Sequence, residues 1–138
     1  MCFAFFILLV VGLPLKAKTS FEGEWRGHVE ETEQNTSSSI FTLQLIQSGK
    51  YVTGRYCYVG RSGAKEDCTT DRDNLHGIIS QDNQALLSFY SPSGLDMGRV
   101  KLILLEGSMT WEVLNYPDQS VFYFPIKYTL NFYGSANI

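Results

Sequence analysis

Cys57 and Cys68 are the side chains whose type and spacing point most directly to chemistry. They enclose a short loop, and in an oxidising compartment such a pair in a small exported domain forms a disulfide. By the chain-entropy estimate, the bridge stabilises the fold by about 2–3 kcal/mol. A metal pair or a redox pair is the alternative, but the chain has no C-x-x-C motif and no second Cys/His pair at ligand spacing. We predict a structural disulfide.

Two histidines, His28 and His76, are the side chains that titrate near neutral pH. His28 falls on the face opposite Trp25 in an alternating strand, which predicts that it points to solvent. Neither histidine has a serine or cysteine nearby in a recognisable nucleophile context, and no triad can be identified from sequence order. The sequence therefore predicts no catalytic residue and no enzyme, and an enzyme is kept only as the third alternative.

Acidic residues crowd the loop around Cys68, namely Glu66, Asp67, Asp71 and Asp73. Alternating carboxylates could bind Ca²⁺, which takes about six to eight oxygen ligands. The calcium-loop pattern is absent, however, and basic residues interleave with the acidic ones, namely Arg61, Lys65 and Arg72. We predict a salt-bridged surface loop, no metal site and no cofactor.

The segment Ser48-Gly49-Lys50-Tyr51 allows two interpretations. Between two strands, Ser-Gly-Lys is what a hairpin turn requires, and Tyr51 then contributes to the packing of the next strand. The segment also resembles a short Ser-Gly-x-Tyr element of periplasmic lysozyme inhibitors, which enters the enzyme cleft on a protruding loop. That resemblance implies that Ser48, Gly49 and Tyr51 form a partner-binding loop. We favour the hairpin and keep the inhibitory loop as the alternative.

An uncharged apolar run from Cys2 to Leu15 precedes Lys16. It is shorter than the roughly 20 residues that a membrane-spanning helix needs. It fits the apolar part of a signal peptide, with Pro14 before a cleavage point after Ala17. A buried N-terminal strand or helix is the alternative. We predict a signal peptide over residues 1–17, a mature domain over 18–138 without a membrane span, and a periplasmic or secreted location.

The mature chain is mildly acidic. Removal of residues 1–17 takes Lys16 from the 11 basic residues and leaves ten against 14 acidic residues, a net charge of −4. Proteins that bind nucleic acid draw most of their affinity from clustered basic residues, so we exclude that class of partner. The remaining length suffices for one domain with a core, and no repeat, low-complexity tract or linker divides it.

Alternating apolar residues and regularly spaced glycines predict short strands rather than helices. We expect strands over 21–31, 40–47, 51–59, 75–80, 84–90, 98–105, 109–114 and 121–132, and a long polar stretch over 60–73. Pro125 demands an edge or a bulge in the last of them. The fold class is therefore all-β. About eight antiparallel strands on this length close most naturally as an up-and-down barrel, with a two-sheet sandwich as the alternative.

The opening Gly23-Glu-Trp25-Arg-Gly27 is similar to the Gly-x-Trp start of lipocalins and avidins, the calycin barrels. That resemblance implies that Trp25 packs at the base of a barrel and plugs it. A closer resemblance, over most of the mature chain, is to a group of small uncharacterised bacterial exported proteins, and it implies no activity. Its pattern includes Gly23 to Gly27, Gly54-Arg-Tyr56-Cys57, Asp67-Cys68 and Met109-Thr-Trp111-Glu-Val113.

These features predict an exported, non-catalytic binding protein with a calycin-like barrel that captures an unidentified small ligand. The alternative is a periplasmic inhibitor or immunity-type protein that blocks a cell-wall hydrolase or toxin through its loops. With eight Tyr and nine Phe in the chain, a filled interior agrees with the sequence as well as an open one does. A filled barrel favours a protein partner, whereas an open apolar cavity favours a small ligand.

Overall fold

The computed structural model describes residues 20–30, 38–60, 63, 65–69, 71–91, 96–116, 124 and 126–138. The signal peptide predicted over 1–17 lies outside these residues. The described residues include no helix that is long and apolar enough to cross a membrane. The described residues form β-strands β1 (Gly23–Glu30), β2 (Ser38–Ser48), β3 (Tyr51–Gly60), β4 (Lys65–Cys68), β5 (Leu75–Gln81), β6 (Gln84–Tyr90), β7 (Met97–Leu104), β8 (Ser108–Asn115) and β9 (Lys127–Gly134).

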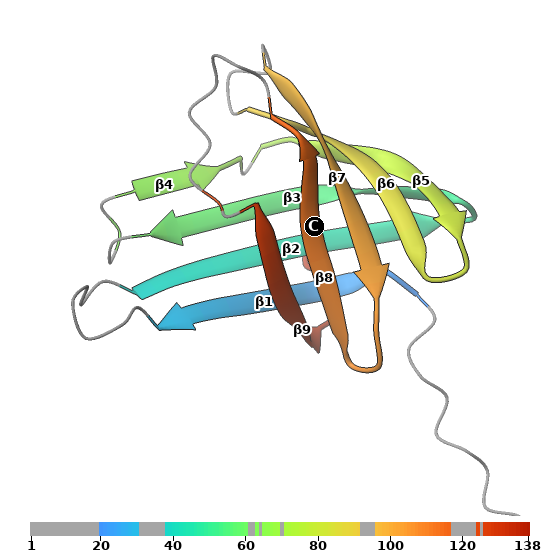
Figure 1. Cartoon of the computed structure of the whole chain (residues 1–138), viewed down its shortest axis with the longest axis horizontal. Helices are drawn as coiled ribbons and strands as arrows, with labels where there is room; N and C mark the ends of the chain where they lie inside the picture. Colours follow the sequence, from blue (N-terminus) through green and yellow to red (C-terminus); the bar gives the residue numbers. More distant parts are fainter. Residues whose placement is uncertain are drawn as a thin grey trace, which may run out of the picture.

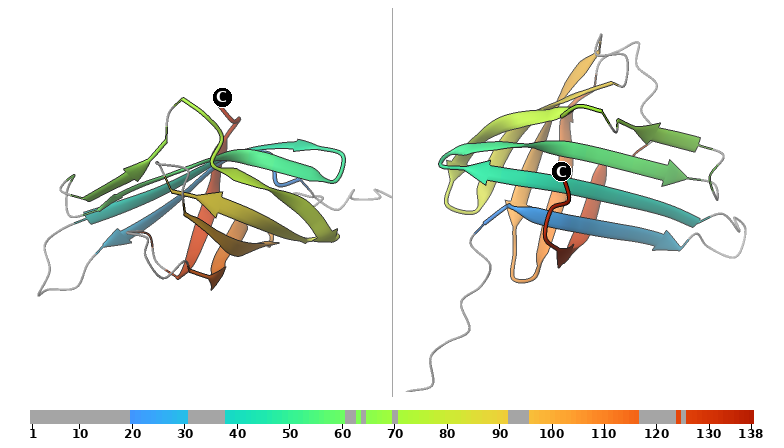
Figure 2. Two further views of the ribbon diagram at one scale, coloured as in Figure 1. Left: turned by 90° about the horizontal axis from the view of Figure 1, so that it is seen from above. Right: turned by 180° about the vertical axis from the view of Figure 1, so that it is seen from behind.

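Eight of these strands close into an antiparallel barrel, so the predicted all-β, up-and-down barrel is confirmed. Strands that follow one another in the chain pair from β1 to β3 and from β5 to β9. Strand β3 pairs β5, and β1 pairs β9 to complete the ring. Figures 1 and 2 show β1 to β3 running across the molecule, with β8 and β9 crossing them on the other side. The core lies between these two curved walls.

Strand β4 lies outside the ring, along the second half of β3. Strand β3 pairs β5 through Tyr51–Gly54 and pairs β4 through Cys57–Gly60, in both cases on the edge opposite β2. Between the two ladders, the backbone N–H of Tyr56 donates to Oδ1 of the buried Asn74 at 3.0 Å. A side chain thus replaces the missing strand. The polar stretch expected over 60–73 therefore contains a strand that charged residues concealed, Lys65–Cys68.

Large side chains fill the described part of the interior. Inward and outward side chains alternate along β6, where Ala85, Leu87 and Phe89 are fully buried. At the centre, the rings of Phe41 and Phe124 both contact Trp111 edge to face, with centroid distances of 4.9 and 5.3 Å. None of these rings is more than 3% exposed. This part of the barrel is therefore packed rather than hollow.

Two glycines permit the close approach of strands where β3 meets β5. A Cβ on Gly54 would overlap the backbone carbonyl of Gln44 on β2, and a Cβ on Gly77 would overlap that of Leu86 on β6. Glycine weakens the interior of a strand, so it is typical of places where a neighbouring backbone must come close, such as the corner of a barrel. This corner brings the β2–β3 hairpin alongside β5.

Candidate functional site

The first candidate site is the end of the β2–β3 hairpin, residues Ser48–Tyr51, which we call the hairpin tip. Strands β2 and β3 stay in register as far as the Ser48–Tyr51 pair, which leaves Gly49 and Lys50 as a two-residue turn. Gly49 has a φ of 58°, in the left-handed region that such turns require. The turn thus forms where the sequence indicates it. It lies at one side of the molecule, next to β5 (Figure 1).

The side chain of Tyr51 is 67% exposed. Its neighbour Val52 is fully buried, and because side chains alternate along a strand, Tyr51 projects from the outer face. The prediction that Tyr51 contributes to strand packing is therefore wrong. Tyr51 is aromatic and Val52 is aliphatic, and strands bury either type, so the sequence does not reveal which of them faces inward. An exposed ring at this position is what the inhibitory-loop interpretation requires.

An open hollow, which we call the tip hollow, lies between the hairpin tip and β5. Its lining consists of Ser48, Gly49, Lys50, Tyr51, Ile78, Ile79 and Ser80. The backbone N–H of Ile79 donates to the carbonyl of Lys50 at 2.8 Å, and Tyr51 lies directly opposite Ile78, which is 50% exposed. Of the described residues in this lining, Lys50 is the one with a charged side chain. The tip hollow therefore combines exposed apolar surface with an ammonium group.

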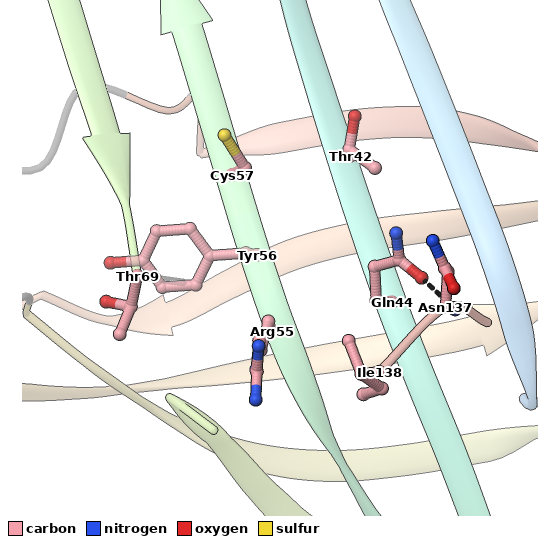
Figure 3. A pocket seen from close by; sticks show the side chains of 8 residues that line it. All are labelled: Thr42, Gln44, Arg55, Tyr56, Cys57, Thr69, Asn137 and Ile138. Atoms are coloured by element: carbon pink, nitrogen blue, oxygen red, sulfur yellow. Dashed lines mark hydrogen bonds between the residues drawn. The ribbon is translucent and has the colours of Figure 1, made fainter. Parts of the chain in front are cut away.

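A second hollow, of about 200 Å³, lies on β2 and β3. Figure 3 shows the side chains that line it. Its lining consists of Thr42, Gln44, Arg55, Tyr56, Cys57, Thr69, Asn137 and Ile138. The Gln44 amide accepts a hydrogen bond from the backbone N–H of Asn137 at 2.7 Å and donates one to Glu24 at 2.8 Å. Arg55 forms an ion pair with Asp73 at 3.3 Å. Because the Gln44 and Arg55 side chains already bond within the protein, these two are less available to a ligand.

Cys57 and Cys68 lie directly opposite each other on β3 and β4 and form a disulfide, as the sequence predicts. Their Cα atoms are 4.2 Å apart. The two cysteines are directly opposed residues of an antiparallel pair, which places their side chains next to each other. The disulfide fastens the outlying strand β4 to the barrel wall.

Asp67, next to this disulfide, is only 2% exposed, so the prediction that it lies in a surface loop is wrong. The Tyr56 hydroxyl donates to Oδ1 of Asp67 at 3.0 Å. Burial raises the pKa of Tyr56 well above its ordinary value, and the charge of Asp67 adds to the effect. Burial and the same charge raise the pKa of Tyr116 to about 12. Both hydroxyls stay protonated at neutral pH, where they serve as donors rather than bases.

The remaining predicted residues take structural or surface positions. Trp25 is fully buried where β1 pairs β9, and its Nε1 donates to the carbonyl of Phe21 at 2.9 Å. His76 is exposed, with Nε2 3.3 Å from the carbonyl of Asp73, whereas the side chain of His28 lies outside the described residues. Among the described residues, no group of three His, Cys, Asp or Glu side chains could hold a metal ion.

Capture of a small ligand inside the barrel stays a prediction, and the packing weighs against it. The described interior is occupied by rings such as Phe41, Tyr56 and Trp111, all fully buried. Comparison with protein-family models, with curated proteins and with solved structures finds no match. A function for this chain therefore has to follow from its own residues, and the hairpin tip with the tip hollow is the surface best suited to a partner.

Proposed function

We propose that the mature protein is an exported, non-catalytic binding module that blocks a cell-wall hydrolase through the hairpin tip. One observation carries the proposal: Tyr51 is 67% exposed at the end of a formed turn, beside a hollow with apolar lining. Tyrosine is enriched at binding hot spots because its ring gives contact area and its hydroxyl gives a hydrogen bond. An inhibitor needs no reacting group and no cofactor.

Two further observations support a protein partner over a small ligand. The described interior is packed with aromatic rings, so a ligand would have to displace core side chains to enter. The residues Ser48-Gly49-Lys50-Tyr51 also resemble the Ser-Gly-x-Tyr element of periplasmic lysozyme inhibitors, and here they lie on an exposed turn. Lysozymes are therefore the first hydrolases to test.

Export to the periplasm or to the medium is part of the proposal. The disulfide supports it, because cytosolic thiols are kept reduced, and so does the apolar run from Cys2 to Leu15. The acidic balance of the mature chain, 14 acidic to ten basic residues after removal of Lys16 from the 11, also favours association with a basic enzyme. Salt should therefore slow the association with such an enzyme.

The test is inhibition of peptidoglycan hydrolysis by a panel of lysozymes, with the purified mature protein and its Tyr51→Ala variant. We expect the parent to inhibit at least one lysozyme. The variant should inhibit at least about 30-fold less well, which is the effect of losing a hot-spot residue. Its melting temperature should stay close to that of the parent, because the ring is mostly exposed.

Tyr133→Ala is the matched control, because Tyr133 is 62% exposed on a different strand, β9. This variant should inhibit as well as the parent does. A parent that inhibits no lysozyme of the panel would contradict the proposal. Equal losses of inhibition in the two tyrosine variants would show that the hairpin tip is not the contact surface.

A further inference from the structure

The outer face beside the hairpin tip carries an apolar row that crosses three strands. Tyr51 on β3 lies directly opposite Ile78 on β5, and Ile78 lies directly opposite Leu86 on β6. Directly opposed side chains on one face are about 5 Å apart, so the three form a continuous strip. Tyr51 and Ile78 are 67% and 50% exposed, and Leu86 is partly exposed. This strip is the apolar half of a contact surface.

Of the described residues that line the tip hollow, Lys50 is the one with a charged side chain, and it is exposed. None of these described lining residues is an aspartate or a glutamate. The backbone carbonyl of Lys50 accepts a hydrogen bond from the N–H of Ile79, which fixes the turn against β5. The exposed Lys50 residue itself contributes to the lining of the hollow. A carboxylate placed beside the apolar strip would therefore meet an opposite charge and no competing acid in the lining.

From this arrangement we infer that the tip hollow takes a surface loop of the protein partner that presents an apolar side chain followed by an acidic one. The inference rests on the proposed function and names the partner chemistry that the site selects. The apolar side chain lies between Tyr51 and Ile78, and the carboxylate lies against Lys50. Ile78 is then a second anchor, on a strand that the turn motif itself does not include.

The hollow can be tested without the enzyme, using blocked dipeptides as probes. In ¹H–¹⁵N NMR spectra, N-acetyl-Leu-Glu-amide at millimolar concentration should shift the amide signals of Lys50, Ile79 and Ser80. N-acetyl-Leu-Lys-amide should bind about two- to fivefold more weakly, the effect of an exposed ion pair. N-acetyl-Ser-Glu-amide should produce little shift. Lys50→Gln should make the Glu and Lys dipeptides equal.

Substitution on β5 provides the second arm. Ile78→Ser should abolish the dipeptide shifts and reduce lysozyme inhibition at least about tenfold, the effect of losing an anchor residue. The control is Leu114→Ser on β8, because Leu114 is exposed to a similar degree, 52%, and lies outside the tip hollow. This variant should behave like the parent in both assays.

The two proposals fail in different ways. Any of three NMR results would overturn the inference, even if the parent inhibits a lysozyme. The dipeptide shifts are scattered over the surface, they are equal for all three dipeptides, or Ile78→Ser leaves them unchanged. Localised shifts that favour N-acetyl-Leu-Glu-amide support the inference. If such shifts occur and no lysozyme is inhibited, the choice of lysozyme as partner is wrong and the specificity of the hollow stands.

Discussion

Replacement of Trp25 by alanine should cost the barrel a large share of its stability. The indole is fully buried, and its ring meets Phe132 of β9 edge to face at a centroid distance of 5.3 Å. Truncation of a buried tryptophan costs about 3–5 kcal/mol. The lost hydrogen bond from Nε1 to the carbonyl of Phe21 adds about 1 kcal/mol. The expected total is about 4–6 kcal/mol, a large part of the stability of a domain this size.

Thermal unfolding followed by circular dichroism measures this loss. For a domain of this length, 1 kcal/mol corresponds to roughly 3–5 °C, so Trp25→Ala should melt roughly 12 to 30 °C below the parent. Trp25→Phe should lie between them, because it keeps a ring and loses the N–H donor. Tyr51→Ala, at an exposed position, should melt within about 3 °C of the parent. A Trp25→Ala protein that melts within a degree of the parent would refute the burial argument.

Three further predictions concern the walls of the barrel. The exported protein should show no free thiol by mass spectrometry, and replacement of Cys57 and Cys68 by alanine should cost about 2–3 kcal/mol. Gly54→Ala should lower the free energy of unfolding, measured in urea, by at least about 1–3 kcal/mol, because its Cβ would overlap a backbone carbonyl. Gly134→Ala should be nearly neutral in the same assay, because no atom lies within 4 Å of its Cβ. The pKa of Tyr56 is near 10 in the unfolded chain and higher in the folded protein. Above pH 10 the unfolded chain therefore loses this proton first, and the free energy of unfolding should fall by up to about 1.4 kcal/mol per pH unit. Tyr56→Phe should fall less steeply there, and an unchanged slope would count against the raised pKa.

Local patterns predicted much of the barrel. The strand expected over 84–90 matches β6 at both ends, because Ala85, Leu87 and Phe89 alternate with outward-facing residues and turns flank the run. The hairpin at Gly49 was likewise visible, since a two-residue turn with positive φ has its own residue preferences. These features depend on residues that are close together in the chain, so the local sequence pattern is enough to predict them.

Features that depend on distant partners were missed. Aspartate is typical of loops, so its type predicts an exposed Asp67. In the fold Asp67 is buried, and the Tyr56 hydroxyl donates a hydrogen bond to its carboxylate. The last strand was expected from residue 121 and begins at Lys127, although residues 121–123 and Pro125 lie outside the described part. Phe124 lies outside β9, and its buried ring is stacked on that of Tyr116 with a centroid distance of 5.9 Å.

The candidate site was predicted in part. Ser48, Gly49 and Tyr51 were identified by a short motif, but the exposure of the Tyr51 ring depends on which face of β3 turns inward. Ile78 was not identified as a site residue. Its place beside Tyr51 comes from the pairing of β3 with β5, two strands that are not consecutive in the chain because β4 lies between them in the sequence. No periodicity within either strand records that pairing.

The seam between β1 and β9 sets the order in which the barrel can assemble. In the described part of the chain, Glu24, Trp25 and Arg26 pair across it, with partners from Asn131 to Gly134, which are more than 100 residues away in the sequence. Contacts of such long sequence separation carry the largest loop-closure cost, so hairpins such as β6–β7 can form first and the ring closes late. In native-state hydrogen exchange, the amides of this short ladder should be among the first barrel amides to exchange through local opening. The closing step of folding and the first step of opening would then share one place, around Trp25.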